Sequence, residues 1–328
     1  MTIALAAAAA LLAVATTPAF PAGFQMVTVP DGDRPALEGG VWYPSDAPAA
    51  PQPLGLYYRQ TVAPDSAIAT RKAPLIVISH GSGGGFDNHY DTALALAEAG
   101  FVVVAVTHNG DSYLGQSRFT RLDRPRQVKA AIDYMLTAWP GHDVIDPARI
   151  GTYGFSAGGL GALVLIGGTL DASLVESYCV NHPEEWACKK GKELAQDPSH
   201  DPARDPVSFV HDARIKAAVI AAPAVGYAFT AKTLAPITVP IQLWRGDHDE
   251  ILPHPRHAQN VYDNLPTKPE YHVVPNAGHF AFLAPCSPAL AQAVPFICHD
   301  PEGFDRAAFH ADFNARAVAF FKAKLSGS

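Results

Sequence analysis

Long apolar stretches of this chain alternate between two kinds of spacing. Residues 73–81 and 101–108 are continuous runs rich in β-branched residues, typical of strands buried on both faces of a mostly parallel sheet. Residues 88–100, between them, carry apolar positions at helical spacing and end on glycine. The alternation continues, with strands expected at 149–155, 215–223, 240–246 and 270–275 and helices at 124–139, 157–168, 254–264 and 305–324. This order predicts βαβ units and an α/β fold with a doubly wound, mostly parallel sheet.

Two segments depart from the alternation. Residues 24–72 are rich in proline, and the short apolar runs 39–44 and 54–59 are expected to be edge strands. Residues 171–212 are charged and contain proline, and they follow the helix expected at 157–168. An insertion there lies above the carboxyl ends of the strands, where open α/β sheets bind ligands. We therefore expect residues 23–328 to form one domain, with 171–212 as a lid or pocket wall, or else as a surface excursion.

The first 22 residues have the pattern of a signal peptide. The apolar run from Ile3 to Val14 is too short to span a bilayer, and small residues follow it. No Lys or Arg occurs before Arg34, so the usual positive start is missing, and an Ala-rich tail or a misassigned start is the alternative. We expect cleavage near residues 19–22 and a secreted or periplasmic protein.

The bulk composition narrows the class of partner. The 328 residues are 48% hydrophobic, enough for a large buried core, and the formal net charge of −7 argues against binding nucleic acid or anionic membranes. No segment beyond the N-terminal run is long and apolar enough to span a membrane. We expect a small-molecule substrate and no cofactor or metal, and the sequence does not indicate the oligomeric state.

Four cysteines follow the N-terminal segment. An even number in an exported chain indicates disulfides, although four cysteines allow three pairings. Pairing of nearest neighbours joins Cys179 to Cys188 and Cys286 to Cys298 and closes two short loops. No zinc-site spacing accompanies them.

The chain sets Gly154, Ser156 and Gly158 between an expected strand and an expected helix, as G-x-S-x-G. A sharp strand-to-helix turn holds its serine in a strained conformation and lifts Oγ above the sheet. Glycines on either side lack a Cβ, so the strand and the helix can approach closely. Negative charge is also favoured at the N-terminus of the helix. Ser156 is therefore the candidate nucleophile.

Partners for this serine follow two later strands, in the order acid and then histidine that such folds require. His279 comes after the strand at 270–275, and its imidazole would take the serine proton as general base. Asp249 and Asp247 both follow the strand at 240–246. The spacing G-x-x-D followed by an aliphatic residue and proline favours Asp249 as the acid, with Asp247 as the alternative or as a turn residue.

A glycine-rich loop, residues 80–85, follows the first buried strand. Backbone N–H groups in such a loop stabilise the oxyanion of acyl transfer. We expect one donor from Ala157, the residue after the nucleophile, and the second from Ser82, or otherwise from Gly83. A phosphate-binding loop is the alternative, but the loop contains no basic residue and no G-K-[ST].

With these motifs the chain resembles the α/β-hydrolase superfamily. More narrowly, it is similar to the dienelactone hydrolase-like group that includes esterases of the platelet-activating-factor acetylhydrolase type. The resemblance extends from about residue 70 to the C-terminus, through SHGSGGG, RPRQVKAAIDYML, GFSAGG, RGDHDEILP and NAGHFAFL. It implies a carboxylic ester hydrolase. Dienelactone hydrolases proper carry cysteine as nucleophile, whereas this chain has Ser156, so dienelactone is not implied as substrate.

Other functions compete with ester hydrolysis. An amidase or peptidase uses the same triad, and a binding module on a hydrolase fold is an alternative from a different class, although such modules usually lose a triad member. A metal-dependent hydrolase based on His254 and His257 is a weaker alternative, because histidines at this spacing are commonly solvated. The charged insertion at 171–212 has no long apolar stripe, which favours soluble short-chain esters over lipid aggregates.

Overall fold

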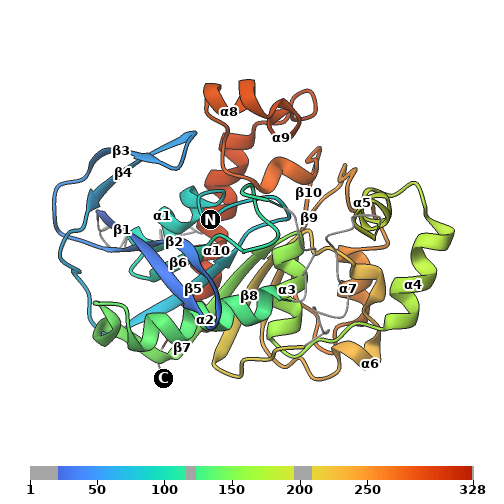
Figure 1. Cartoon of the computed structure of the whole chain (residues 1–328), viewed down its shortest axis with the longest axis horizontal. Helices are drawn as coiled ribbons and strands as arrows, with labels where there is room; N and C mark the ends of the chain where they lie inside the picture. The colour runs from blue at the N-terminus through green and yellow to red at the C-terminus, as the bar shows by residue number, and fades with distance from the viewer. Residues whose placement is uncertain (1–20, 116–122, 196–208, 327–328) are drawn as a thin grey trace, which may run out of the picture.

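A ten-stranded sheet with helices on both faces forms the protein in the computed structural model, which describes residues 21–115, 123–195 and 209–326 (Figure 1). The strand order is β10-β9-β8-β7-β5-β6-β2-β1-β4-β3. Their bounds are β1 Ala22–Asp31, β2 Arg34–Pro44, β3 Ala50–Leu54, β4 Tyr58–Pro64, β5 Ala73–Ser79, β6 Val102–Val106, β7 Ile145–Phe155, β8 Ile215–Ala221, β9 Ile241–Gly246 and β10 Glu270–Val274.

Strands β5 to β10 are all parallel and form one half of the sheet. Every residue of β6 is buried, as are all but one each in β5 and β8, which explains their uninterrupted apolar sequences. The crossover helices have these bounds: α1 Tyr90–Glu98, α2 Arg124–Thr137, α3 Ala157–Leu165, α6 Ala231–Leu234 and α7 Ala258–Asn264. The prediction of a doubly wound, mostly parallel sheet is confirmed.

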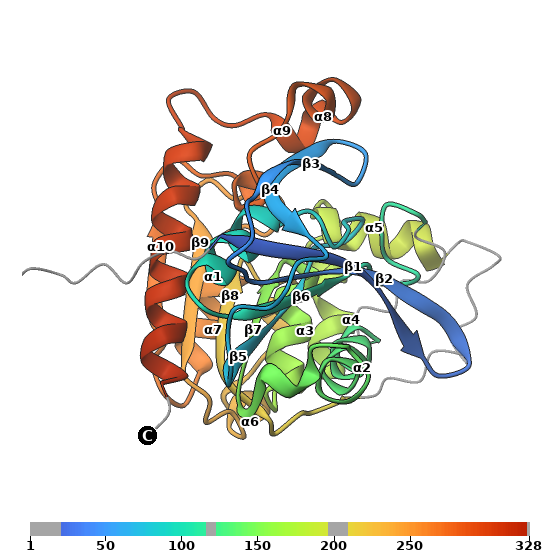
Figure 2. The same cartoon turned by 90° about the vertical axis from the view of Figure 1, so that its left-hand side faces the viewer.

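Helices cover the sheet from both sides. Figure 2 shows α1 and the C-terminal helix α10 (Arg306–Lys324) on one side, and α2 and α3 on the other. Phe313 and Phe321 of α10 are fully buried, and Phe321 contacts Phe101 at the start of β6. The parallel strands are therefore shielded on both faces, and ligands can approach only at the strand ends.

The N-terminal strands differ from the sequence-based expectation. Residues 39–44 belong to β2, which lies between β1 and β6 rather than at an edge, and Val41, Trp42 and Tyr43 are fully buried. Residues 54–59 span the β3–β4 hairpin: 55–57 form its turn, Leu54 ends β3, and Tyr58 and Arg59 begin β4. The true edge is β3, whose Pro51 and Pro53 lack the N–H that an interior strand must donate. The edge assignment of 39–44 was therefore wrong.

The insertion and the C-terminal tail carry short helices and both disulfides. The insertion forms α4 (Ala172–Asn181) and α5 (Trp186–Ala195), and the tail forms α8 (Pro288–Ala293) and α9 (Pro295–Cys298). Disulfides join Cys179 to Cys188 and Cys286 to Cys298, which confirms the nearest-neighbour pairing. Each closes a short loop and is worth about 3 kcal/mol in the loop-entropy account.

Two further expectations concern membranes and the chain start. In the described part of the chain, no helix has the length and apolar character needed to cross a bilayer. The expected signal peptide, 1–22, lies almost wholly outside the described residues, which begin at residue 21.

Candidate active site

Ser156 occupies the sharp turn between β7 and α3. Its backbone has φ 55° and ψ −114°, a conformation that residues other than glycine rarely adopt. The surrounding backbone holds it there: Ser156 N–H donates to the carbonyl of Ala221 at 2.9 Å, and its own carbonyl accepts from Leu160 and Ala224 at 3.0 Å. The strained turn predicted for this serine is therefore present. Ser156 is largely buried, with 9% of its surface exposed.

Glycines allow this turn to pack tightly. A Cβ on Gly154 would lie 2.3 Å from the carbonyl oxygen of Gly158, and one on Gly158 would lie 2.0 Å from the carbonyl oxygen of Ser79 in β5. Both clashes involve backbone atoms, which cannot move aside as a flexible side chain can. The G-x-S-x-G pattern thus reflects contact between α3, β7 and β5.

His279 and Asp249 meet Ser156 in a hydrogen-bonded chain. Nε2 of His279 lies 3.1 Å from Ser156 Oγ, and Nδ1 lies 2.8 Å from Asp249 Oδ2. His279 is 2% exposed and Asp249 7% exposed. The His279 ring also packs against Phe155, with centroids 4.9 Å apart. The three residues predicted from the sequence come together in the order that serine activation requires.

The two candidate acids lie in different environments. Asp249 is buried, and its second oxygen, Oδ1, accepts hydrogen bonds from the N–H groups of Ile251 and Leu252 at 3.0 and 2.7 Å. Asp247 is exposed, and its backbone N–H bonds to the carbonyl of Val274. Of the two candidates, the geometry therefore favours Asp249, because its carboxylate is hydrogen-bonded to the His279 imidazole.

The glycine-rich loop after β5 lies against the candidate nucleophile, Ser156, since a Cβ on Gly81 would be 3.4 Å from Ser156 Cβ. Gly83 N–H donates to Asp111 Oδ1 at 3.2 Å, so it is already engaged. No hydrogen bond joins the N–H of Ser82 to another described residue, and Ala157 begins α3, so its N–H has no intrahelical acceptor. This arrangement favours Ser82 over Gly83 as the partner of Ala157.

A buried polar cluster behind this loop was missed in the sequence. It consists of His80, His108, Asp111 and Arg124, each at most 1% exposed. Arg124 is the first residue of α2, within the segment RPRQVKAAIDYML, which was noted for its helical spacing and its resemblance to a family motif but not for a buried arginine. An arginine at the start of an amphipathic helix is ordinarily solvated, and no local pattern signals that it will be buried.

The insertion contacts the segment that follows the candidate acid, Asp249. Glu185, between α4 and α5, accepts hydrogen bonds from Tyr178 at 2.7 Å and Arg256 at 2.8 Å, and its Oε2 lies 3.4 Å from His257 Nε2. Burial alone would raise the pKa of Glu185, but these hydrogen bonds lower it to about 2. The insertion is thus joined to the segment that follows Asp249.

The proposed histidine metal site is not favoured by this geometry. His257 is buried beside Glu185, whereas His254 is exposed. Among the described residues, one group of three potential ligands lies close together, namely His182, Glu184 and Glu185. Glu185 in that group is already ion-paired with Arg256 at 2.5 Å.

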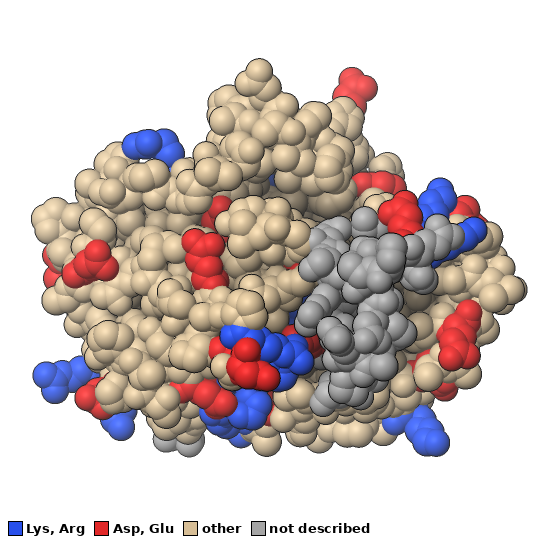
Figure 3. All heavy atoms as spheres, viewed as in Figure 1, with Lys and Arg blue, Asp and Glu red and all other residues tan. Residues whose placement is uncertain are grey.

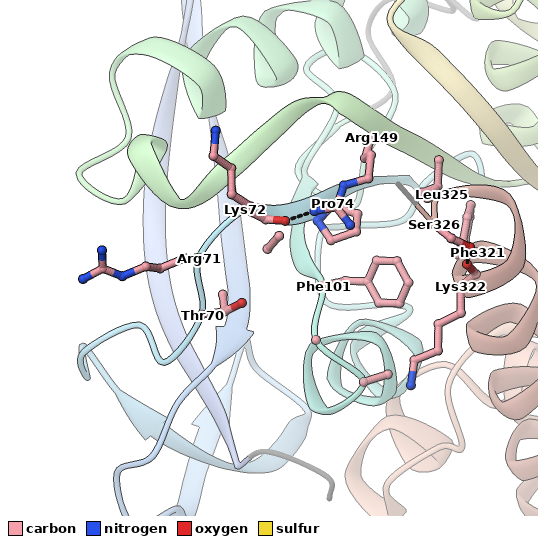
Figure 4. A pocket seen from close by; sticks show the side chains of 13 residues that line it. Thr70, Arg71, Lys72, Pro74, Phe101, Arg149, Phe321, Lys322, Leu325 and Ser326 are labelled. Atoms are coloured by element: carbon pink, nitrogen blue, oxygen red, sulfur yellow. Dashed lines mark hydrogen bonds between the residues drawn. The ribbon is translucent and has the colours of Figure 1, made fainter. Parts of the chain in front are cut away.

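A surface cavity of about 380 Å³ lies at the amino ends of the parallel strands, opposite the carboxyl ends that Ser156 and His279 follow (Figure 4). Lys72, at the start of β5, and Arg149, early in β7, line it together with Lys322 of α10. The nitrogen atoms of Lys72 and Lys322 point in different directions in Figure 4. Because Ser156 follows the carboxyl end of β7, this cavity is separate from the triad.

Charged residues are mixed on the face shown in Figure 3. Lys and Arg side chains lie beside Asp and Glu along its lower margin, and much of the upper part is uncharged. Among the described residues of this face there is no continuous basic surface, in keeping with the net charge of −7.

Comparison with known proteins identifies the fold. No protein-family model matches the chain, and no curated protein sequence matches it. Among solved structures, it is similar to a ferulic acid esterase from Streptomyces cinnamoneus, with a TM-score of 0.63 and 18% sequence identity, over 95% of this chain and 92% of the other. The protein therefore has the α/β-hydrolase fold.

The packing of α3 predicts opposite effects of alanine at two glycines of that helix. Gly158→Ala should lower the free energy of unfolding by about 1–3 kcal/mol or more, because its Cβ overlaps the Ser79 carbonyl. Gly161→Ala is the matched control: its Cβ would make ordinary contacts of 3.5 and 3.9 Å with Arg124 and Pro125. It should gain about 0.5–1 kcal/mol, since alanine is the better helix former. Urea unfolding measures both, and equal stability of the two variants would contradict the packing argument.

Proposed function

We propose that the protein is a serine hydrolase that cleaves carboxylic esters through an acyl-enzyme intermediate. The hydrogen-bonded chain from Ser156 through His279 to Asp249, set on a strained turn, is the observation that carries the proposal. A non-catalytic module would have no need to hold all three side chains at these distances in a buried site.

Each residue has a defined part in the reaction. Ser156 Oγ attacks the ester carbonyl carbon while its proton passes to His279 Nε2. The N–H groups of Ala157 and Ser82 stabilise the resulting oxyanion. When the intermediate collapses, the C–O bond to the alcohol breaks and the alcohol takes the proton from His279. Water, activated by the same imidazole, then releases the acid and restores Ser156.

Asp249 fixes the tautomer of the base. Its Oδ2 accepts from His279 Nδ1–H, so Nε2 is left free to accept the serine proton, and the carboxylate stabilises the imidazolium that forms. The N–H groups of Ile251 and Leu252 keep the carboxylate in place. A rigid carboxylate costs no reorganisation during the reaction.

One observation supports esters over amides as the substrate class: a ferulic acid esterase shares the fold. The triad itself is common to both, but an alcohol leaving group needs less assistance than an amine. The narrower assignment to the dienelactone hydrolase-like group rests on the sequence motifs and remains part of the proposal. Serine in place of cysteine argues for simple carboxylic esters rather than dienelactones.

The insertion supports a preference for small, soluble esters. Helix α4 has no buried residue, the disulfide Cys179–Cys188 joins it to α5 within the insertion, and Glu185 pairs with Arg256 of the body of the protein. Such a segment lacks the long apolar stripe of a lid that opens on a lipid surface. We propose that residues 171–212 wall the site over acyl groups of about two to four carbons. The part of this insertion at 196–208 lies outside the described residues.

The triad predicts a graded set of variants. Ser156→Ala and His279→Ala should abolish hydrolysis of p-nitrophenyl acetate, and Asp249→Asn should lower kcat by about 10⁴-fold through the wrong imidazole tautomer. Asp247→Asn is the matched control, because it makes the same change on an exposed carboxylate two residues away. It should retain activity, and a reversed order of the two aspartate variants would refute the assignment of the acid.

Substrate size is tested by a series of p-nitrophenyl esters from acetate to palmitate. We expect kcat/KM to be highest between acetate and butyrate, because each methylene that fits gains about 0.8 kcal/mol and each that overfills the site loses more. Methyl ferulate tests for a bulky aromatic acyl group. A maximum at long chains, a jump in rate above the critical micelle concentration, or a preference for the ferulate would overturn the short-chain assignment.

We also propose that the protein is exported, in keeping with its two disulfides and the apolar start of the chain. Protein isolated natively from its source should contain no free thiol and should begin near residues 19–22 by N-terminal mass spectrometry. Four alkylatable cysteines in that native material, or an intact residue 1, would contradict export.

A further inference from the structure

We propose that Arg124 is a positioning residue that fixes the Gly81–Ser82 peptide so that the Ser82 N–H faces the nucleophile. The inference rests on the proposed function, since it concerns the oxyanion hole of that reaction. It assigns a task to the helix start RPRQV, which the catalytic triad does not use.

The Arg124 guanidinium, from the start of α2, is buried against the loop that follows β5 and binds its carbonyl oxygens. It is 1% exposed and donates to the carbonyl oxygens of both His80 and Gly81, the latter at 3.2 Å. It also donates to Asp111, from Nε at 3.2 Å and from Nη2 at 2.8 Å. A planar guanidinium can serve these acceptors together because its donors are fixed in a fork.

The Gly81 carbonyl determines where the next N–H points. Its oxygen is held by three donors: Arg124 Nη2, the N–H of Gly84 at 3.2 Å and His80 Nδ1 at 2.6 Å. In a trans peptide the C=O and the following N–H point in opposite directions. The Ser82 N–H is therefore turned away from the guanidinium, while Gly81 itself lies against Ser156. Rotation of this peptide would remove one of the two oxyanion donors.

Neutral His80 supports the same carbonyl. Its Nδ1–H donates to Gly81, and its Nε2 accepts from the N–H of His108 at 3.0 Å, so the partners assign one neutral tautomer. Burial, with the nearby charge of Arg124, lowers the pKa of His80 to about 3. This contact therefore does not titrate at neutral pH.

Arg124 also balances a negative charge beside the site. Asp111 accepts from the N–H of Gly83 at 3.2 Å and from Ser82 Oγ at 3.1 Å. Burial alone would raise the pKa of Asp111, but Arg124 lowers it overall and keeps the carboxylate ionised. Without its ion pair, the Asp111 carboxylate would lie beside the proposed donor Ser82 and would repel the negative charge that develops on the oxyanion. The ion pair removes this repulsion while it braces the loop.

Arg124→Lys tests the assignment, because an ammonium keeps the charge but cannot reach all the acceptors of the fork. We expect kcat for p-nitrophenyl acetate to fall by about 10²-fold, as after loss of an oxyanion donor, while KM changes less than about threefold. The inhibition constant of a trifluoromethyl ketone, which forms an oxyanion on Ser156, should rise by a similar factor.

Arg126→Lys is the matched control on the same helix. Among the described residues, Arg126 pairs with Asp31 and Asp123 and has no hydrogen bond to residues 80–85, so its variant should keep kcat and the inhibition constant near wild type. A double variant, Arg124→Gln with Asp111→Asn, removes both charges together and leaves neither buried alone. It should show the same loss of kcat, and it carries the test if Arg124→Lys does not fold.

The outcomes separate this inference from the proposed function. If the folded variants keep kcat within threefold of Arg126→Lys, or if KM rises while the inhibition constant does not, the positioning role is wrong and ester hydrolysis stands. If the wild-type protein shows no hydrolysis that depends on Ser156, the proposed function fails and this inference fails with it.

Discussion

The contact between the start of α3 and the end of β5 is the constraint on which the site depends. Gly158 lies so close to the Ser79 carbonyl that a Cβ would be 2.0 Å from its oxygen. This approach forces the chain to leave β7 through a sharp turn, with Ser156 at φ 55°. The same contact places the N-terminus of α3 beside the glycine-rich loop. The proposed nucleophile and the proposed oxyanion donors are thus positioned by backbone packing.

Parallel strands bring the remaining groups to that turn. Ser156 and His279 are 123 residues apart in sequence, and Asp249 and His279 are 30 apart, yet each follows the carboxyl end of a strand in one sheet. Helices cover both faces of the sheet (Figure 2), so these groups gather at the edge formed by the strand ends. Burial of Arg124 and Asp111 then makes the loop after β5 rigid. A site assembled this way is preorganised for the charge of an oxyanion before substrate arrives.

Sequence patterns predicted the features that depend on local spacing. The strands β5 to β10 were predicted because uninterrupted apolar runs are local, and the three residues proposed as the triad, which the structure brings together, were predicted from local strand-end motifs. The interior position of β2 was not, because it depends on pairing with β1, whose alternating sequence was read as part of a proline-rich segment. The burial of Arg124 was missed for the same reason: its acceptors lie 13 to 44 residues away. The helix expected at 254–264 also begins later, at Ala258, because a residue that precedes proline, here His254 before Pro255, is disfavoured in the helical conformation.

The central claim is that Ser156 is a nucleophile activated by His279. Labelling with a fluorophosphonate, followed by peptide mass spectrometry, tests it most directly, because only an activated serine reacts rapidly with this probe. The account predicts one phosphonyl group per chain, located on Ser156, and greatly slowed labelling of the His279→Ala variant. Absence of labelling, a modification on another residue, or an unchanged rate in His279→Ala would contradict it.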